Sequence, residues 1–225
     1  ASFPTGVGTG RVNAHLAVKA AESSFTTGMD LYIKDRPEDF GNEVFPYHWA
    51  ADRDESPDIW VRNQNDGFEN QEHQEPEYDS TAPVYVYVKV RNSIGSEKLA
   101  LHWSKAGSWS GWPDHWDGTL PEIGDQIGLE TLPVIEAGDD LIVEFVWNIP
   151  SPYVFHNWSS CLMARIENSV VDPITIHPDR LDDDVFFNNN VAMRNVTIID
   201  FIPGIVGPPT VGTVQYPYGK YIYMG

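Results

Sequence analysis

The chain has 225 residues, of which 41% are hydrophobic and 12% aromatic, a composition that supports a folded core rather than a disordered segment. Its 33 Asp and Glu outnumber its 14 Lys and Arg, and the formal net charge of −19 repels nucleic acid phosphates and anionic lipid, so we expect no nucleic acid partner. One cysteine, Cys161, allows no internal disulfide, and no run of about 18 apolar residues predicts membrane insertion.

Residues 1–24 begin with a glycine-rich stretch and continue as a short amphipathic helix. Asn13 is a suitable N-cap, and Val12, Leu16 and Ala20 recur four apart on one side. An isolated helix of fewer than about 12 residues is marginal in water, so its apolar stripe needs a partner surface. No signal-peptide pattern is present, so we expect any export signal to precede Ala1.

The order of residues 8–21, GTGRVNAHLAVKAA, resembles the C-terminal helix that closes the catalytic domain of subtilisin-like serine proteases. The resemblance implies that residues 1–24 are the remnant of an upstream protease domain, which is then the partner of the helix. The alternative is an ordinary N-terminal helix of a free-standing protein. The Gly-Thr-Ser turn that carries the nucleophile in that family does not occur here, and no other nucleophile–base motif is found, so we predict that this chain is not an enzyme.

From residue 28 to about residue 202 the hydrophobic period changes to two, which predicts β-strands. In the clearest one, 83–91, four valines face the core while Tyr85, Tyr87, Lys89 and Arg91 face away. A turn at 92–96 predicts an antiparallel hairpin with the strand at 99–104, and a second turn is predicted at 136–140. The remaining predicted strands are 29–34, 58–63, 127–135, 141–147, 161–167 and 190–200.

About eight short strands without intervening helices indicate a mainly β fold, an antiparallel immunoglobulin-like β-sandwich with a short N-terminal helix. From about residue 58 to residue 200, the segments DIWVRN, VYVYVKVRNSIGSEKLALHW, GDDLIVEFVW, CLMARIENS and NNNVAMRNVTIID, in that order, resemble CARDB-type adhesion-like domains of bacterial surface and secreted proteins. The resemblance implies a non-catalytic module, secreted or at the cell surface. Residues 203–225, rich in Pro, Gly and Tyr, are predicted to be a tail or linker.

A tryptophan-rich loop is the first candidate ligand site. Exposed tryptophan faces stack on sugars or extended peptides, and a nearby histidine supplies polar contacts. The alternative is that the loop buries its aromatic residues in a small satellite core against the sheet. Outward-facing tyrosines of the strand at 83–91 would extend the platform. The candidate residues are Trp109, Trp112, His115, Trp116, Tyr85 and Tyr87.

The second candidate site is an oxygen-rich stretch, Asp182, Asp183 and Asp184, followed by Asn188. Such ligands suit one structural Ca²⁺, the only cofactor that we consider. The sequence does not complete a D-x-D-x-D-G loop, and Asp and Asn also gather in loops because they satisfy turn backbone. Both interpretations stay open.

Two functions follow from these patterns. The first is a non-catalytic C-terminal accessory region of a secreted bacterial subtilisin-like protease, with the upstream protease domain as partner, serving as spacer, stabiliser or attachment module. The second is an independent cell-surface module that binds a polysaccharide or protein surface through the tryptophan-rich loop.

Overall fold

A computed structural model of the chain describes residues 31–39, 41, 55–106, 112–175, 185 and 187–200. The helix predicted within residues 1–24 and the tail at 203–225 lie outside these described residues. Within them, no helix has the length and apolar character that a membrane crossing requires.

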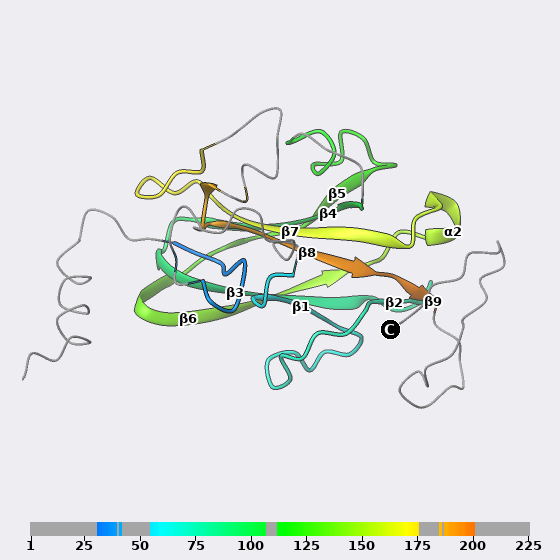
Figure 1. Ribbon diagram of the computed structural model, residues 1–225, viewed down its shortest axis with the longest axis horizontal. Coiled ribbons are helices and arrows are strands. Elements are labelled where there is room, and N and C mark those ends of the chain that lie inside the picture. The colour runs from blue at the N-terminus through cyan, green and yellow to red at the C-terminus, as the bar shows by residue number, and fades with distance from the viewer. Residues whose placement is uncertain are drawn as a thin grey trace, which may run out of the picture.

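Two antiparallel sheets lie face to face as two layers (Figure 1). Sheet A has the order β1 (Ile59–Arg62), β3 (Val84–Ile94), β6 (Val134–Trp147). Sheet B has the order β5 (Gly124–Thr131), β4 (Lys98–Lys105), β7 (Ser159–Glu167), β8 (Val191–Thr197). Short β2 (Glu77–Tyr78) pairs in parallel with β9 (Ile199–Asp200), and α2 (Pro152–Phe155) is a single turn. The predicted antiparallel β-sandwich is confirmed.

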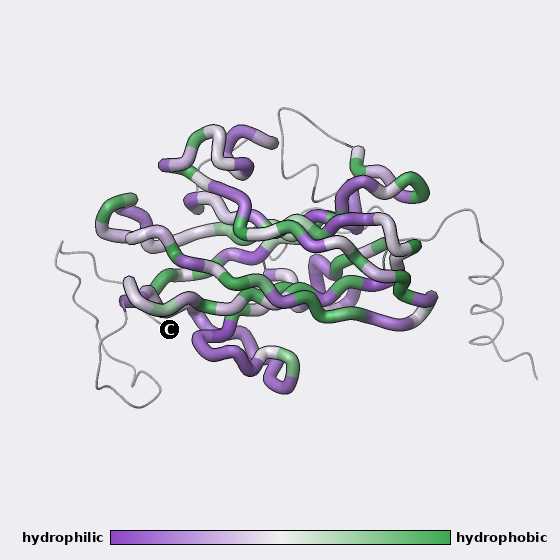
Figure 2. Tube along the Cα trace, turned by 180° about the vertical axis from the view of Figure 1, so that it is seen from behind, coloured by the Kyte–Doolittle hydropathy of each residue, from purple (hydrophilic) through white to green (hydrophobic). Residues whose placement is uncertain are grey.

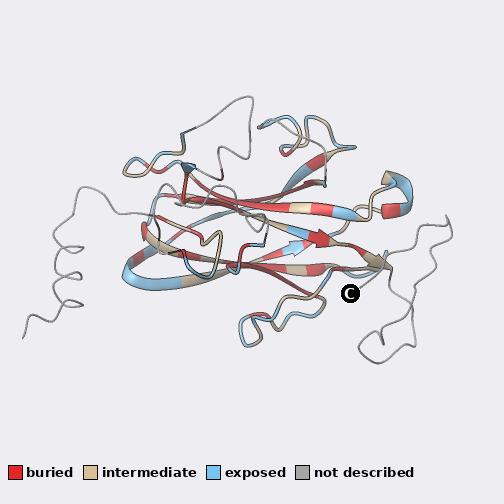
Figure 3. Ribbon diagram, viewed as in Figure 1, coloured by how far each residue is buried: buried red, intermediate tan, exposed pale blue. Residues whose placement is uncertain are grey.

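Side chains that alternate along the strands fill the space between the sheets, as predicted. Figure 3 shows this buried interior as the red segments of the strands. Each valine on the inner face of β3 contributes roughly 1.5 kcal/mol or more by leaving water. The buried inner residues of β3, β4 and β7 are Val84, Val86, Val88, Val90, Leu99, Leu101, Trp103, Leu162, Ala164 and Ile166.

The predicted hairpin between the strands at 83–91 and 99–104 is wrong. β3 pairs with β1 along one edge and with β6 along the other, whereas β4 pairs with β5 and β7 in sheet B. Because both edges of β3 are occupied, the chain leaves sheet A after Ile94 and crosses to sheet B within three residues. Alternation shows which face a side chain takes, but a hairpin and a crossing between sheets produce the same alternation.

A buried carboxylate organises this crossing. Glu97 accepts hydrogen bonds from Ser93 Oγ at 2.7 Å and from the backbone N–H groups of Ile94 and Gly95 at 3.1 Å each. Gly95 takes a positive φ of 86°. Burial raises the pKa of Glu97, but the hydrogen bonds together outweigh burial, and the net pKa lies below its ordinary value. Glu97 is therefore ionised at neutral pH and holds the turn.

The turn predicted at 136–140 is also wrong, because these residues lie inside β6. The register passes from the pair Arg91–Asp140 to the pair Ser93–Ile135, so residues 136–139 form a bulge without partners on β3. Gly138 takes a φ of 92° within it. The chain instead crosses from β5 in sheet B to β6 in sheet A at residues 132–133. Gly and Asp favour a bulge for the same backbone reason that they favour a turn.

Residues 31–39 and 41 lie beside sheet A and add to its core. Of the strand predicted at 29–34, the described part pairs with β3 through one bridge, Tyr32 to Arg91. Leu31 and Ile33 on either side are buried in the core. Ile33 N–H donates to Asn189 O at 2.9 Å, so this segment ties sheet A to the chain entering sheet B.

We expect Glu97→Gln to lower the free energy of unfolding by about 2 kcal/mol, because an amide cannot accept all the bonds of the carboxylate. Urea denaturation measures the loss, and Glu130→Gln on exposed β5 is the control. Since the folded pKa is lowered, the stabilisation is present above the unfolded pKa of about 4.3 and is lost as pH falls through the folded pKa. A difference that stays constant down to low pH contradicts this role.

Candidate functional site

The described tryptophans of the predicted ligand loop pack inward. Residues 112–123 form a cap on the outer face of sheet B, and Trp116 is 1% exposed in a cluster with Met163 and Val191. The half-buried Trp112 ring lies 3.8 Å from the guanidinium carbon of buried Arg165. Trp112 and Trp116 therefore pack as in the second alternative, a small satellite core against the sheet. Trp109 lies outside the described residues.

A buried histidine attaches the cap to β4. His102 Nδ1 lies 2.8 Å from the Trp116 carbonyl oxygen, which only accepts, so Nδ1 carries the proton. Burial lowers the pKa of His102 to about 4, and the positive charge of Arg165 acts in the same direction. His102 is therefore neutral at pH 7 and serves the packing of the cap. His115 is half-buried in the same segment.

We expect Trp116→Ala to cost about 3–5 kcal/mol of unfolding free energy, the usual range for a buried tryptophan. Glu122→Ala, on the exposed surface of the same cap, is the control and changes stability by less than about 0.5 kcal/mol. Chemical denaturation followed by circular dichroism measures both. Equal, small losses in the two variants would show that Trp116 is a surface residue free for a ligand.

Asn188, the described member of the proposed Ca²⁺ group, serves the fold. Its Oδ1 accepts from the Thr175 N–H at 2.6 Å, and its amide donates to the Thr175 carbonyl at 3.0 Å. Asp182, Asp183 and Asp184 lie outside the described residues. In the part of the chain that is described, no three His, Cys, Asp or Glu side chains are grouped to hold a metal. The Ca²⁺ site stays a prediction.

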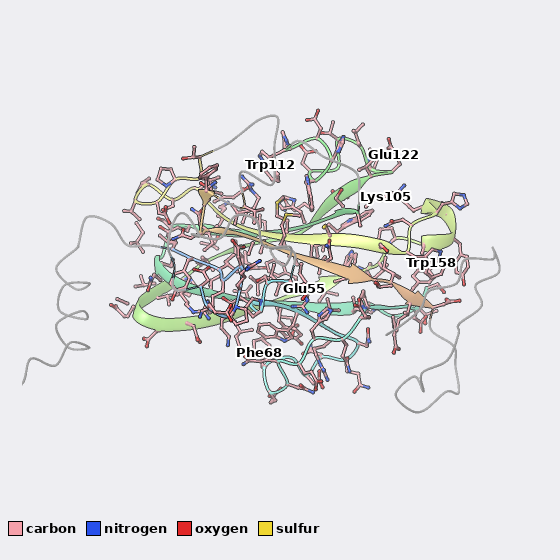
Figure 4. The ribbon with its side chains drawn as sticks, in the orientation of Figure 1. Glu55, Phe68, Lys105, Trp112, Glu122 and Trp158 are labelled. Carbon is pink, nitrogen blue, oxygen red and sulfur yellow. The ribbon has the colours of Figure 1, made fainter. Side chains whose placement is uncertain are left out.

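Tyr85 and Tyr87 lie on the outer face of sheet A and do not extend the tryptophan platform. Figure 4 shows Trp112 on one side of the sandwich and Phe68, beside Tyr87, on the other. The two groups of predicted ligand residues therefore form separate surfaces. Tyr87 is 0% exposed because residues 63–76, which we name the covering loop, lie over it.

Side-chain hydrogen bonds fix the covering loop to the outer face of β1 and β3. The Trp60 and Tyr87 rings stack beneath it with centroids 5.6 Å apart. These bonds join Trp60 Nε1 to Gly67 O (3.2 Å), Tyr87 Oη to Asn65 Oδ1 (3.1 Å), Lys89 Nζ to Gln71 Oε1 (2.7 Å) and Arg62 to both Asp66 oxygens (2.7 and 2.8 Å). A loop tied down at so many points is preorganised.

The covering loop also occupies the outer edge of β1. Val61 N–H donates to His73 Nδ1 at 3.1 Å, and Gln74 N–H donates to Val61 O at 3.0 Å. Burial lowers the pKa of His73 to about 3, and the charge of Arg194 adds to this effect. The imidazole is therefore neutral at physiological pH and Nδ1 remains an acceptor.

Phe68 of the covering loop and the outer face of β3 and β6 beside it present apolar side chains. Phe68 is 49% exposed and Val146 is 48% exposed, while Tyr85 and Ile142 are half-buried. Phe68 meets Tyr87 edge-on at 5.3 Å, and Tyr85 pairs with Val146 across the strands. We name Phe68, Tyr85, Ile142 and Val146 the sheet A patch, and it is the candidate functional site.

Acidic groups outnumber basic ones around the sheet A patch, where Lys89 stands opposite Ile142 and its Nζ donates to Gln71 Oε1 of the covering loop at 2.7 Å. Residues 63–79 contain six Asp and Glu, and no Lys or Arg occurs between Arg62 and Lys89. Figure 2 shows the covering loop as an almost wholly hydrophilic segment beneath the sandwich. Glu144 stands between Ile142 and Val146 on β6; Asn65 donates to its Oε1 at 3.1 Å, and its Oε2 has no donor among the described residues.

Sequence reasoning included Tyr85 but missed Phe68 and Val146. Phe68 is the one apolar side chain in the run from Asn63 to Glu75, so an aromatic ring there stands out from its polar neighbours. Val146 falls on the outward side of a strand whose inward side is filled by Phe145 and Trp147. Each of the two residues is an apolar side chain at a position where its neighbours predict a polar one.

We expect Gly67→Ala to lower the free energy of unfolding by about 1–3 kcal/mol. An added Cβ lies 2.2 Å from the Tyr87 ring, which cannot move because Trp60 and Phe68 contact it. Ser80→Ala, exposed in the same connection, is the control. Urea denaturation measures the free energy of unfolding, and protease cleavage within the covering loop measures its local opening. If Gly67→Ala changes neither quantity more than Ser80→Ala does, the packing of Gly67 against Tyr87 is contradicted.

No protein-family model matches the chain, and no curated protein matches it. Among solved structures, a hemolymph-type prophenoloxidase (proPOb) from a crustacean aligns with 11% identity and a TM-score of 0.33. The alignment covers 54% of this chain and 25% of that one. Similarity at this level carries no conclusion about function.

Proposed function

We propose that the chain is a non-catalytic accessory module that holds a protein partner on the sheet A patch. The observation that carries the proposal is the exposure of Phe68, in the fixed covering loop, and of Val146, on β6, each about half exposed. Exposed apolar side chains gathered on one face and rimmed by polar groups are typical of protein interaction sites.

Preorganisation supports the same function. The covering loop is fixed to β1 and β3 by hydrogen bonds through Asn65, Gly67 and Gln71, so Phe68 is already presented in place. Binding to such a surface loses little conformational entropy. The cap formed by residues 112–123 offers no comparable surface, because its Trp116 is buried.

The resemblance of residues 8–21 supports a parent protein for this module. We propose a secreted bacterial subtilisin-like protease, in which the module attaches a substrate or a surface, spaces the domains or stabilises them. The alternative is an independent cell-surface module that binds polysaccharide or protein. The gene sequence upstream of Ala1 distinguishes them: a Gly-Thr-Ser nucleophile turn supports the first, and a signal peptide directly before Ala1 supports the second.

Surface plasmon resonance tests the patch with reduced, S-alkylated lysozyme as an extended protein probe at physiological salt. We expect the immobilised chain to bind it and the double variant Phe68→Ser, Val146→Ser to bind at least tenfold more weakly. Val154→Ser, Val170→Ser is the matched control, because both valines are exposed elsewhere and the net charge is unchanged. Equal binding by the two double variants, or no binding by the unaltered chain, would overturn the proposed function.

A further inference from the structure

One side of the sandwich is closed by chain segments that occupy the strand edges. The outer edge of β1 bonds to His73 and Gln74 of the covering loop. The outer edge of β8 bonds to Ser56, whose N–H donates to Met193 O at 3.0 Å, next to a bridge between Glu55 and Arg194.

The opposite side carries the outer edges of β5 and β6. No strand in the described part of the chain pairs with either edge. From Asp140 to Trp147, β6 keeps an unbroken register with β3, so its outer N–H and C=O groups form a regular row. β5 lacks this regularity, because its register with β4 shifts between Leu101 and His102.

The side chains beside the outer edge of β6 determine which segment suits it. Ile142 and Val146 of the sheet A patch supply apolar contacts on the outer face, with Glu144 between them. β6 also carries Glu136, Asp139 and Asp140. Pairing with a second copy of β6 would place carboxylates against carboxylates on chains that each carry −19, so charge disfavours a copy and favours a basic strand.

We propose that β6 accepts an extended Lys- or Arg-containing segment of a protein partner as an added strand of sheet A. The segment pairs with the backbone of residues 140–147, places apolar side chains on Ile142 and Val146, and directs basic side chains toward Glu144 and the acidic covering loop. This mode of recognition takes affinity from backbone hydrogen bonds and specificity from alternate side chains. The inference rests on the proposed function, since it names the partner of the same site.

Amide hydrogen exchange by NMR tests the inference with the peptide acetyl-Val-Thr-Lys-Thr-Val-Thr-Lys-amide as probe, in which Val and Lys alternate along one face of the strand, as Ile142, Glu144 and Val146 require. We expect exchange to slow at least tenfold for amides within residues 140–147 that do not bond to β3, with no change in β5. The same peptide N-methylated at alternate residues cannot form the strand and binds at least tenfold more weakly to the unaltered chain. The same peptide with Glu in place of both Lys residues does not bind.

A matched pair of charge reversals locates the site. Glu144→Lys weakens binding of the basic peptide at least tenfold, while Glu130→Lys on β5, with the same change in net charge, leaves it within twofold. Equal binding of the N-methylated peptide, or a stronger effect of Glu130→Lys, would overturn strand addition at β6. If the alkylated lysozyme still depends on Phe68 and Val146 in that case, the proposed function stands and only this inference fails.

Discussion

Both edges of β3 are occupied, and the rest of the sandwich depends on that constraint. With β1 on one edge and β6 on the other, the chain has to leave sheet A after β3, and it does so through a crossing built on a buried carboxylate, Glu97. The same constraint makes β6 an outer strand of sheet A. The inner face of β3 fills the core, and its outer face carries Tyr85 and Tyr87, so one strand links the stability of the molecule to its candidate binding surface.

In the part of the chain that the structure describes, the strand edges are covered by chain segments on one side of the sandwich and are open on the other. On the β1 and β8 side, the covering loop and residues 55–56 use the edge backbone groups, and the loop continues over the outer face of sheet A. On the β5 and β6 side, the described residues leave those groups to solvent, protected by acidic side chains. Charge on an edge strand suppresses pairing between copies, and it leaves open pairing with a strand of opposite charge.

The sequence was a good guide to faces and a poor guide to partners. Alternation predicted the inward valines of β3 and the inward residues of β7, because burial enforces a period of two. It did not predict that β3 and β4 are unpaired, since pairing depends on the edges of β3, which β1 and β6 already occupy. Residues 136–140 looked like a turn because Gly138 permits positive φ, which a bulge needs equally. The composition of the tryptophan-rich loop predicted a ligand site, yet Trp116 is buried, whereas Phe68, in a polar run, is half exposed.

The outer face of sheet A, and not the described part of the cap at residues 112–123, is the exposed surface on which we propose recognition. Hydroxyl-radical footprinting of the free chain tests it most directly, because the modification of a side chain follows its exposure. The account predicts strong modification of Phe68 and Tyr85 together with protection of Tyr87 and Trp116, which are buried. Strong modification of Trp116 with protection of Phe68 would contradict it.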